Sequence, residues 1–260
     1  MILSERQQYI LEVLRRHSSV SVSELSKTMQ VSEVTIRKDL TQMEQLKLLY
    51  RTHGKAVLLN PFISDRHINE KERNNAAEKL AISRHAASMI SSGESIMIAS
   101  GTTMHFLARE IKPLDRLTVV TSAVPVTSIL LKEPTSEVIL LGGAVRPSSL
   151  SVVGPYAEQM LENFLCSKLF LGVDGIDFEF GLTTTNLMEA SLNRAMMRAA
   201  QQTIVLADSS KFGRRGFSRI CAIDAVNEII TDDKIADDIA SRIEDCGVKL
   251  TVVPLKDTEE

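Results

Sequence analysis

The sequence has few cysteines and no metal-binding histidine spacing, and both absences narrow what the protein can be. Its 3 cysteines, Cys166, Cys221 and Cys246, lie far apart and fit neither a disulfide framework nor a paired zinc site. Its 5 histidines are never spaced as HxH or HxxxH, so a metal site built by the protein is not expected. We therefore expect buried thiols in a reducing compartment, and no metal or other cofactor.

The sequence also lacks a run of about 18 apolar residues, the length that a membrane-spanning helix needs. Its N-terminal segment carries Glu5, Arg6, Arg15 and Arg16 where a signal peptide would be apolar. We expect a cytoplasmic protein with no membrane partner. Because 44% of the 260 residues are hydrophobic, the chain can bury a sizeable core, and its length predicts one large domain or two unequal ones.

The net charge of −3 conceals a difference between the two ends of the chain. Residues 1–60 contain 9 Lys or Arg and 6 Asp or Glu, a balance of +3, whereas the remaining 200 contain 21 and 27, a balance of −6. A basic N-terminal segment joined to an acidic body favours a polyanion partner for the segment. Chance scatter explains a balance of this size equally well, so the charge alone decides nothing.

The N-terminal segment predicts three short helices. Apolar residues recur at helical spacing from Glu5 to His17, and the next residues indicate a break. The S-x-x-E capping box at Ser21 predicts a second helix over about 22–29. After a short connection, Ser32 caps a third helix that runs to about Lys47. Three helices joined so closely are typical of a helix-turn-helix.

The third helix has two different faces. Ile36, Leu40 and Met43 share one face and are expected in a small core. An exposed valine beside basic side chains on the other face suits the major groove of DNA, where valine contacts a thymine methyl and arginine or lysine reaches a base or a phosphate. An ordinary amphipathic helix with solvated charges is the alternative. The DNA-contacting residues expected on this helix are Ser32, Val34, Thr35, Arg37, Lys38 and Thr41.

Two apolar runs around His53-Gly54 then predict a β-hairpin, the wing of a winged helix-turn-helix. Basic side chains near its tip would lie against the phosphate backbone, namely Arg51, His53 and Lys55. We expect a DNA-binding domain over 1–58, a polar linker over 59–75 and a second domain over 76–260. A helical pattern of apolar residues from Lys71 to Ile90 leads into the second domain.

Beyond Gly93, short apolar runs alternate with amphipathic stretches. The runs are SIMIAS, LTVVTS, EVILLGG, KLFLGVD, TIVLAD, EIITD and KLTVV. Runs that are apolar on both faces and separated by helices predict a doubly wound, mostly parallel sheet. The expected fold class is therefore α/β, with an N-terminal winged helix-turn-helix.

Ligands bind such sheets at the carboxyl ends of the strands, so the residues after each run are candidates. The segment SGTT before the helical MHFLAREI exposes backbone N–H groups that favour a phosphate, although such turns also use these residues for conformation alone. Carboxylates accept hydrogen bonds from sugar hydroxyls, and a cation holds phosphate. Arg214 and Arg215 are expected on a solvated loop instead. The candidate effector-binding residues are Ser100, Gly101, Thr102, Thr103, Thr121, Ser122, Gly142, Gly143, Asp174, Gly175, Glu189 and Lys211.

Together and in this order, the motifs resemble the DeoR family of bacterial repressors, from about Arg6 to Val253. SVSELSKTMQVSEVTIRKDLTQME and RTHGKAVL resemble its N-terminal domain, and SGTTMHFLA, VVTSA, LLGG, LFLGVDGID, GLTTTNLMEA and LADSSKFGRRGF resemble its C-terminal sensor domain. The resemblance implies a sensor fold related to ribose-5-phosphate isomerase, repression without ligand, and release when a sugar phosphate binds. Two departures are Lys47, where the family usually has Gly, and Lys55, which replaces the second Gly of the wing's HGG.

Two other functions compete with a ligand-gated repressor. A sugar-phosphate isomerase-like enzyme would use Asp174, Glu189 and Lys211 as acid-base groups, but an isomerase has no use for a helix-turn-helix. A nonspecific DNA-associated structural protein is disfavoured by the acidic body. We therefore expect no catalytic residue. The expected partners are operator DNA, a small phosphorylated sugar and a further copy of the chain, because a helix-turn-helix of this size usually works as a dimer.

Overall fold

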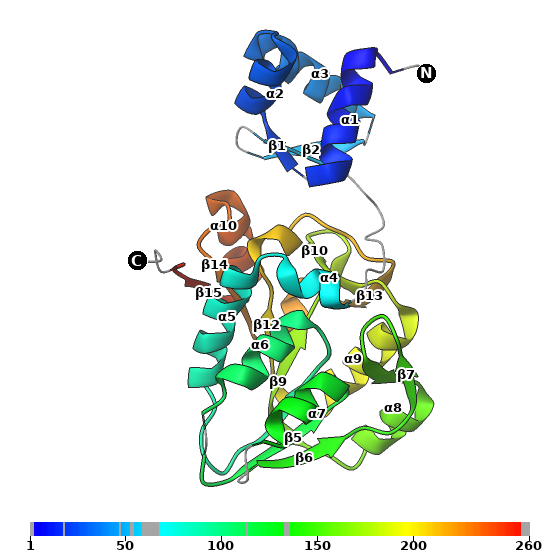
Figure 1. Cartoon of the computed structure of the whole chain (residues 1–260), viewed down its shortest axis with the longest axis vertical. Coiled ribbons are helices and arrows are strands. Elements are labelled where there is room, and N and C mark those ends of the chain that lie inside the picture. Colours follow the sequence, from blue (N-terminus) through cyan, green and yellow to red (C-terminus); the bar gives the residue numbers. More distant parts are fainter. Residues whose placement is uncertain are drawn as a thin grey trace. The chain divides into compact units, whose positions relative to one another are not determined.

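The computed structural model describes residues 3–17, 19–46, 48–52, 55–58, 68–112, 114–132 and 136–255. The chain divides into two compact units, Met1–Pro61 and Phe62–Glu260 (Figure 1). We call them the N-terminal unit and the C-terminal unit. The division falls close to residue 58, where the sequence analysis ends the DNA-binding domain.

The N-terminal unit contains three helices and a small antiparallel sheet, so the winged helix-turn-helix is confirmed. Its elements are α1 Glu5–His17, β1 Ser19–Ser21, α2 Val22–Met29, α3 Glu33–Gln45, β2 Leu49–Thr52 and β3 Lys55–Leu58. The sheet order is β1-β3-β2. The interpretation of residues 18–20 as a mere break was incomplete, because Ser19 begins a short strand that pairs with β3.

Capping and core packing fix the three helices. Ser21 accepts a hydrogen bond from the N–H of Glu24 at 3.1 Å, and Ser32 does the same for Thr35 at 3.2 Å. Between α2 and α3 the chain turns through Gln30 in the left-handed region, at φ 52°. The side chains of Ile36, Leu40 and Met43 are fully buried, as predicted, in a core shared with Ile10, Leu14 and Leu25.

The C-terminal unit is built on a seven-stranded sheet in which every neighbouring pair is parallel. Its strands are β4 Ser95–Ile98, β5 Leu117–Thr121, β6 Ser136–Leu140, β9 Cys166–Gly172, β12 Ala200–Leu206, β14 Glu228–Asp232 and β15 Lys249–Val253. These are the seven predicted runs. The order β15-β14-β12-β9-β4-β5-β6 means that the chain winds outward from β4 to β6, returns to β9 and winds outward again. The winding direction therefore switches between β4 and β9.

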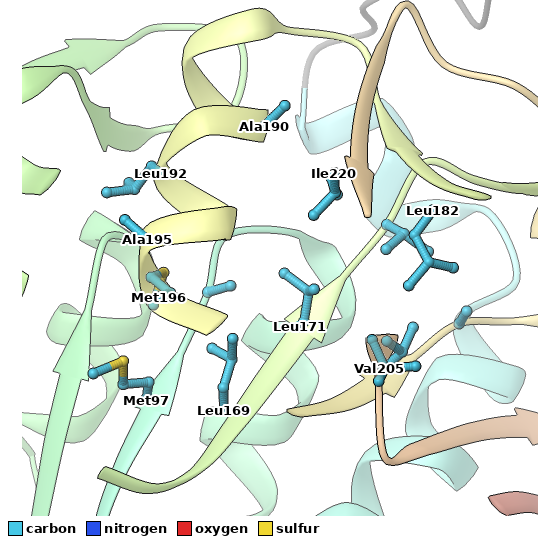
Figure 2. Packing of buried hydrophobic residues seen from close by; sticks show 14 of the residues in the cluster. Met97, Leu169, Leu171, Leu182, Ala190, Leu192, Ala195, Met196, Val205 and Ile220 are labelled. Atoms are coloured by element: carbon cyan, nitrogen blue, oxygen red, sulfur yellow. The ribbon is translucent and has the colours of Figure 1, made fainter. Parts of the chain in front are cut away.

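Helices cover both faces of this sheet (Figure 1). One face packs against α5 Ala76–Ser88, α6 Thr102–Glu110 and α7 Val124–Leu130, and the other against α8 Pro155–Leu161, α9 Leu187–Arg198 and α10 Asp237–Asp245. Side chains alternate between the two cores along each strand, so Leu169 and Leu171 of β9 pack with α9 while Phe170 faces the other core. Figure 2 shows Ala195 and Met196 of α9 beside these two leucines.

Several short antiparallel strands were not predicted, because three or four residues carry too little pattern. They are β7 Ala144–Arg146 with β8 Ser151–Val153, and a sheet of β10 Gly175–Asp177, β11 Gly181–Thr184 and β13 Ser218–Cys221. Two 3₁₀ turns, Ser209–Lys211 and Ile223–Ala225, complete the described elements. These small elements extend beyond the carboxyl ends of the central strands and supply part of the pocket described below.

The segment from 68 to 88 differs from its prediction. The single helical pattern from Lys71 is broken, because Asn75 adopts the left-handed conformation at φ 51° between α4 Ile68–Arg73 and α5. Helix α4 thus occupies part of the segment predicted to be a linker. The ammonium of Lys79 is buried and donates hydrogen bonds to the backbone carbonyls of Lys71 and Asn74, which holds the end of α4 against α5. Burial lowers the pKa of Lys79 to about 8.

Candidate functional sites

The outer face of α3 is uncovered within the N-terminal unit. Val34 is 76% exposed, more than any other large apolar side chain among the described residues. Arg37 and Lys38 are exposed beside it. A valine that leaves most of its surface uncovered in its own unit, flanked by two cations, is a natural contact surface for an anionic partner with apolar groups.

The other predicted residues of α3 make contacts within their own helix. The hydroxyls of Ser32 and Thr35 lie 2.9 Å apart at the helix cap, and the hydroxyl of Thr41 donates to the carbonyl of Arg37 at 2.7 Å. The guanidinium of Arg37 pairs with Glu33 at 3.1 Å, with both side chains largely exposed. Such an exposed pair is weak, so Arg37 can exchange it for a phosphate or a base.

Among the described residues, a charged contact between Arg51 and Glu44 joins the wing to α3. Arg51 on β2 donates from its side chain and from its backbone N–H to Glu44, each at 2.9 Å. Lys55 at the start of β3 is exposed. The predicted contact His53 and the departure at Lys47 lie outside the described residues. Sequence reasoning missed Asp39, a buried carboxylate on α3 that forms an ion pair with Arg6 of α1.

In the C-terminal unit a pocket opens at the point where the winding direction switches. Its cavity volume is about 60 Å³, and it lies at the carboxyl ends of β4 and β9. Helix α4, the loop between β7 and β8, and helix α9 complete its walls. The lining residues are Ile68, Lys71, Ser100, Gly101, Thr102, Thr103, Ser148, Ser149, Gly172, Val173, Asp174, Thr184, Glu189, Asn193 and Lys211.

The start of α6 forms one wall of the pocket. Gly101 caps the helix at φ 128°, a conformation that a residue with a side chain rarely adopts, and it brings no side-chain acceptor to the first turn. The first N–H groups of α6 are therefore available to a ligand, and the helix dipole favours an anion there. Gly172 at the end of β9 permits a close approach, because a Cβ there would lie 3.1 Å from the carbonyl oxygen of Ser100.

The carboxylate of Asp174 accepts hydrogen bonds from several groups in and beside this pocket. It accepts them from the ammonium of Lys71 at 2.9 Å, and from the Thr184 hydroxyl and the Thr185 N–H at 3.1 Å each. Burial alone would raise the pKa of Asp174. The charges of Lys71 and Lys211, with these hydrogen bonds, outweigh burial and hold the pKa below its ordinary value. Asp174 is therefore ionised at neutral pH.

Glu189, on the first turn of α9, is surrounded by donors in the same way. Arg146 approaches one carboxylate oxygen at 2.7 Å, the Ser151 hydroxyl donates to that oxygen at 3.0 Å, and the Thr184 hydroxyl lies 3.2 Å from the other. Glu189 thereby anchors the loop between β7 and β8. Thr184 contacts both carboxylates, so Asp174 and Glu189 belong to one connected network.

Two other polar side chains in the pocket keep their hydrogen-bonding capacity. The ammonium of Lys211 acts on Asp174 through its charge, and neither an ion pair nor a hydrogen bond joins it to another described residue. Asn193 on α9 is buried, and no hydrogen bond from its side-chain amide to a described residue is present. Both groups are therefore available to a bound molecule.

The structure brings seven of the twelve candidate effector-binding residues to this pocket, which are Ser100, Gly101, Thr102, Thr103, Asp174, Glu189 and Lys211. The remaining five, Thr121, Ser122, Gly142, Gly143 and Gly175, lie outside the described lining.

Local structure accounts for four of these positions, Thr121, Ser122, Gly143 and Gly175. The Thr121 hydroxyl bonds to the Ile98 carbonyl and the Ala123 N–H, which fixes the turn after β5, and Ser122 is buried beside it. A Cβ on Gly143 or Gly175 would meet a neighbouring backbone oxygen at 2.7 or 2.3 Å. A position at the end of a strand therefore does not by itself predict a pocket residue. The residues after β5 form a turn, and those after β6 lead into the β7-β8 hairpin.

Sequence reasoning missed most of the pocket residues that come from outside the strand ends. Lys71 lies on the segment predicted as a linker, and Ser148 and Ser149 lie in a hairpin loop without a strand signal. A signal for Asn193 was present, because it follows Glu189 by one helical turn and so shares its face. The predicted solvated loop at 214–215 is half-buried instead, since Arg215 pairs with Asp177 at 2.9 Å.

In the part of the chain that the structure describes, no group of three or more His, Cys, Asp or Glu side chains could hold a metal ion. Nor is any described helix both long and apolar enough to span a bilayer.

Comparison with known proteins gives consistent matches for both units. A family model described as the DeoR-like helix-turn-helix domain matches residues 6–62, and one described as the DeoR C terminal sensor domain matches residues 74–233. An uncharacterized HTH-type transcriptional regulator of Bacillus subtilis, YulB, is 39% identical over 255 residues, which cover 98% of each chain. The lactose phosphotransferase system repressor of Staphylococcus epidermidis is 31% identical over 232 residues, covering 88% of this chain and 92% of that one.

Among solved structures, ribose 5-phosphate isomerase A from Methanocaldococcus jannaschii aligns with 54% of this chain and 55% of its own. The identity is 14% and the TM-score 0.40. A TM-score below 0.5 gives this likeness no weight in an argument about function.

Proposed function

Since the chain belongs to the DeoR family of DNA-binding transcription regulators, we propose that it represses a sugar-utilisation operon and leaves its operator when a phosphorylated sugar binds. The observation that carries the proposal is that one chain joins a helix with exposed cations, Arg37 and Lys38, to a pocket lined by the start of α6 and by Lys211, which has no ion-pair partner among the described residues. The name of the Staphylococcus relative, a lactose phosphotransferase system repressor, supports the part of the proposal that concerns sugar utilisation.

For DNA binding, we assign α3 as the helix that enters the major groove. Arg37 and Lys38 reach bases or phosphates, Val34 contacts a thymine methyl, and the wing residues Arg51 and Lys55 contact the backbone of the duplex. The remaining predicted contacts, Ser32, Thr35, Thr41 and His53, stay part of this proposal. The test uses a duplex that the full chain itself selects from a random library, so no operator needs to be known in advance.

Replacing Arg37 by Ala should cost about 1 to 3 kcal/mol of binding and relax the preference at one base pair, if Arg37 reads a base edge. Equal losses on the selected and on a random duplex would reduce Arg37 to a phosphate contact. Lys112→Ala, which removes an exposed cation from the C-terminal unit, is the matched control. Unchanged binding by the Arg37→Ala, Lys38→Ala double variant would refute the assignment of α3.

For the effector, we assign the phosphate to the first turn of α6 and to Lys211. The N–H groups after Gly101 and the hydroxyls of Ser100, Thr102 and Thr103 supply donors, and Lys211 supplies an ammonium that forms no ion pair with a described residue. A thermal-shift panel of sugar phosphates, each beside its unphosphorylated sugar, tests this. A ligand at about 100 times its dissociation constant stabilises the folded chain by about 2.7 kcal/mol, so a binder is readily seen. Equal shifts with and without the phosphate group would contradict the assignment.

Helix α4 offers a path by which the pocket can influence DNA binding. It is the first described element after the N-terminal unit along the chain, and its residues Ile68 and Lys71 line the pocket. The Ile68 N–H donates to the Ser148 carbonyl at 2.8 Å, and Lys71 pairs with Asp174. A ligand bound in this pocket therefore lies against α4 and can change these contacts.

The coupling between the two sites can be measured directly. A coupling free energy of about 1 to 3 kcal/mol corresponds to a change of about 5- to 150-fold in operator affinity, and linkage requires the same factor for the effector. Calorimetric titration of the effector, with and without the selected duplex, should therefore give different affinities. Equal affinities would mean that the C-terminal unit is not a sensor coupled to DNA. Asp174→Ala should weaken the effector response and leave DNA binding intact.

We infer that the chain is not an enzyme, because the pocket carboxylates are held by cations and hydroxyls and a regulator gains nothing by consuming its signal. Isomerisation of any bound sugar phosphate at about 1 per second or faster would overturn this inference and favour the isomerase-like alternative. We further infer a homo-oligomer in the cytoplasm, because a winged helix-turn-helix commonly reads two half-sites as a dimer. Light scattering on the full chain tests the oligomer.

A further inference from the structure

The polar walls of the pocket divide into groups that already have partners and groups that do not. The carboxylates of Asp174 and Glu189 each lie among three donor groups of this chain, of which the Thr184 hydroxyl is shared and donates its single hydrogen to one carboxylate at a time. Each is also neutralised by one cation, Lys71 or Arg146. A carboxylate has about four acceptor positions, so little capacity is left for a ligand. These two carboxylates are therefore positioning residues, which hold α4 and the β7-β8 loop.

Asn193 is in the opposite situation. It is only 5% exposed, it lines the pocket, and its side-chain amide makes no hydrogen bond to another described residue. None of its amide atoms is among the described side-chain atoms that are both shielded from solvent and unpartnered, so the amide keeps access to the pocket, and a ligand that fills the pocket has to supply a hydrogen bond in place of solvent. It lies one turn after Glu189 on α9, and the cap of Asn186 on the N–H groups of Met188 and Glu189 fixes the start of that helix.

We propose that Asn193 is a specificity-determining residue of this pocket, which hydrogen-bonds an uncharged hydroxyl group on the sugar part of the bound sugar phosphate. This proposal rests on the proposed function. An amide offers both a donor and an acceptor, and a hydroxyl group offers both in return, so the two match without a change of charge. The phosphate has better partners in Lys211 and the first turn of α6, where donors and positive charge meet.

A double comparison of protein variant and ligand variant tests the contact. The probes are inorganic phosphate, a panel of hexose 6-phosphates, and for each member that binds, the analogues that lack one hydroxyl group. Calorimetry on the full chain gives the affinities. Asn193→Ala should bind the sugar phosphate about 5- to 150-fold more weakly, the effect of leaving one buried polar group unpaired. Its affinity for inorganic phosphate should stay within about twofold, because that probe makes no sugar contact.

The deoxy analogues separate a direct contact from a structural effect. The wild-type chain should discriminate against one deoxy analogue, and Asn193→Ala should lose that discrimination while keeping it at the other hydroxyl groups. A structural role would weaken all the sugar phosphates and inorganic phosphate together. Asn163→Ala, an exposed asparagine in the same unit, is the matched control and should change nothing. Asn193→Leu fills nearly the same space without a polar atom, so it serves if the alanine variant fails to fold, and it too should lose the discrimination.

Three results would overturn the proposal. If the alanine variant binds each sugar phosphate as the wild type does, Asn193 is not a contact, although the proposed function stands. If discrimination at every hydroxyl survives in both variants, the effect of Asn193 is structural. If neither inorganic phosphate nor any sugar phosphate of the thermal-shift panel binds the wild-type chain, the proposed effector is wrong and this contact falls with it.

Discussion

The two candidate sites of this chain are built in opposite ways. On α3 the side chains that would meet DNA face solvent, and their contacts are with their own helix, as in the Arg37 to Glu33 pair. In the pocket the polar side chains are buried or half-buried and are held by residues far away in sequence, as in the Lys71 to Asp174 pair, 103 positions apart. The α3 surface thus depends on the order of residues along one helix, whereas the pocket forms only when distant segments of the C-terminal unit fold together.

This difference has a consequence for mutation. An exposed side chain on the outer face of α3, such as Val34 or Lys38, can be replaced with little effect on folding, because most of its surface is uncovered in its own unit. A residue of the pocket network cannot, because its removal leaves a buried partner without its hydrogen bond or its opposite charge. Loss of function without loss of stability is therefore expected from α3, and mixed effects from the pocket.

The largest expected effects come from the two cores. Leu40→Ala in the N-terminal unit and Leu171→Ala in the C-terminal unit each remove a fully buried leucine, at a cost of about 2 to 5 kcal/mol. Because the two leucines belong to separate clusters, each change should weaken one unit. Hydrogen exchange read by mass spectrometry should rise across one unit per variant. A rise of equal size in both units would show that they unfold together, and the comparison of two independent sites would fail.

A buried histidine makes the C-terminal unit sensitive to acid. Burial of His105 on α6, with the charge of Arg109, outweighs the charge of Glu72 and lowers its pKa to about 4. Its Nε2 atom is buried and has no hydrogen-bond partner among the described residues. Between pH 6.5 and about 4 the unfolded chain binds a proton that the folded chain does not, so the free energy of unfolding falls as the pH falls.

The expected loss over this range is about 3 kcal/mol, from about 1.4 kcal/mol per pKa unit, and it is absent above pH 6.5. Urea denaturation of the wild-type chain and of His105→Leu, at several pH values, measures it. The leucine variant should match the wild type at pH 8 and become the more stable protein near pH 4.5. Parallel losses in the two proteins would show that other groups cause the acid sensitivity.

How far the sequence predicts each site follows from the same difference. The sequence predicted the three N-terminal helices, the serine caps of α2 and α3, the buried face of α3 and the seven parallel strands. Each of these features depends on a local pattern of a few adjacent residues. Lys71 and Ser148 were not predicted, since they reach the pocket only through a break at Asn75 and a hairpin that no local pattern marks. Conversely, Thr121 and Gly143 carried the expected local pattern but serve a turn and a close backbone approach.

Helix caps in the two units provide a smaller and more selective test. Ser21 caps α2 and Asn186 caps α9, and replacing either by Ala should cost about 1 kcal/mol of stability. The Asn186 variant should in addition bind the effector more weakly, because α9 carries Glu189 and Asn193. The Ser21 variant should bind it unchanged. Thermal unfolding and calorimetry on both variants distinguish these outcomes, and an equal loss of effector binding would contradict the assignment of α9 to the pocket.

The smallest effect should come from Val34, and it tests the claim that the outer face of α3 is purely a contact surface. Because this side chain is 76% exposed, Val34→Ala should leave the free energy of unfolding within about 0.5 kcal/mol of the wild type. On the selected duplex, losing an apolar contact of about one methyl group should weaken binding by about 0.8 kcal/mol, roughly fourfold. Replacing the contacted thymine by uracil removes the methyl group from the other side. If valine and methyl touch, the two losses should not add, whereas additive losses at every thymine would mean that Val34 contacts no base there.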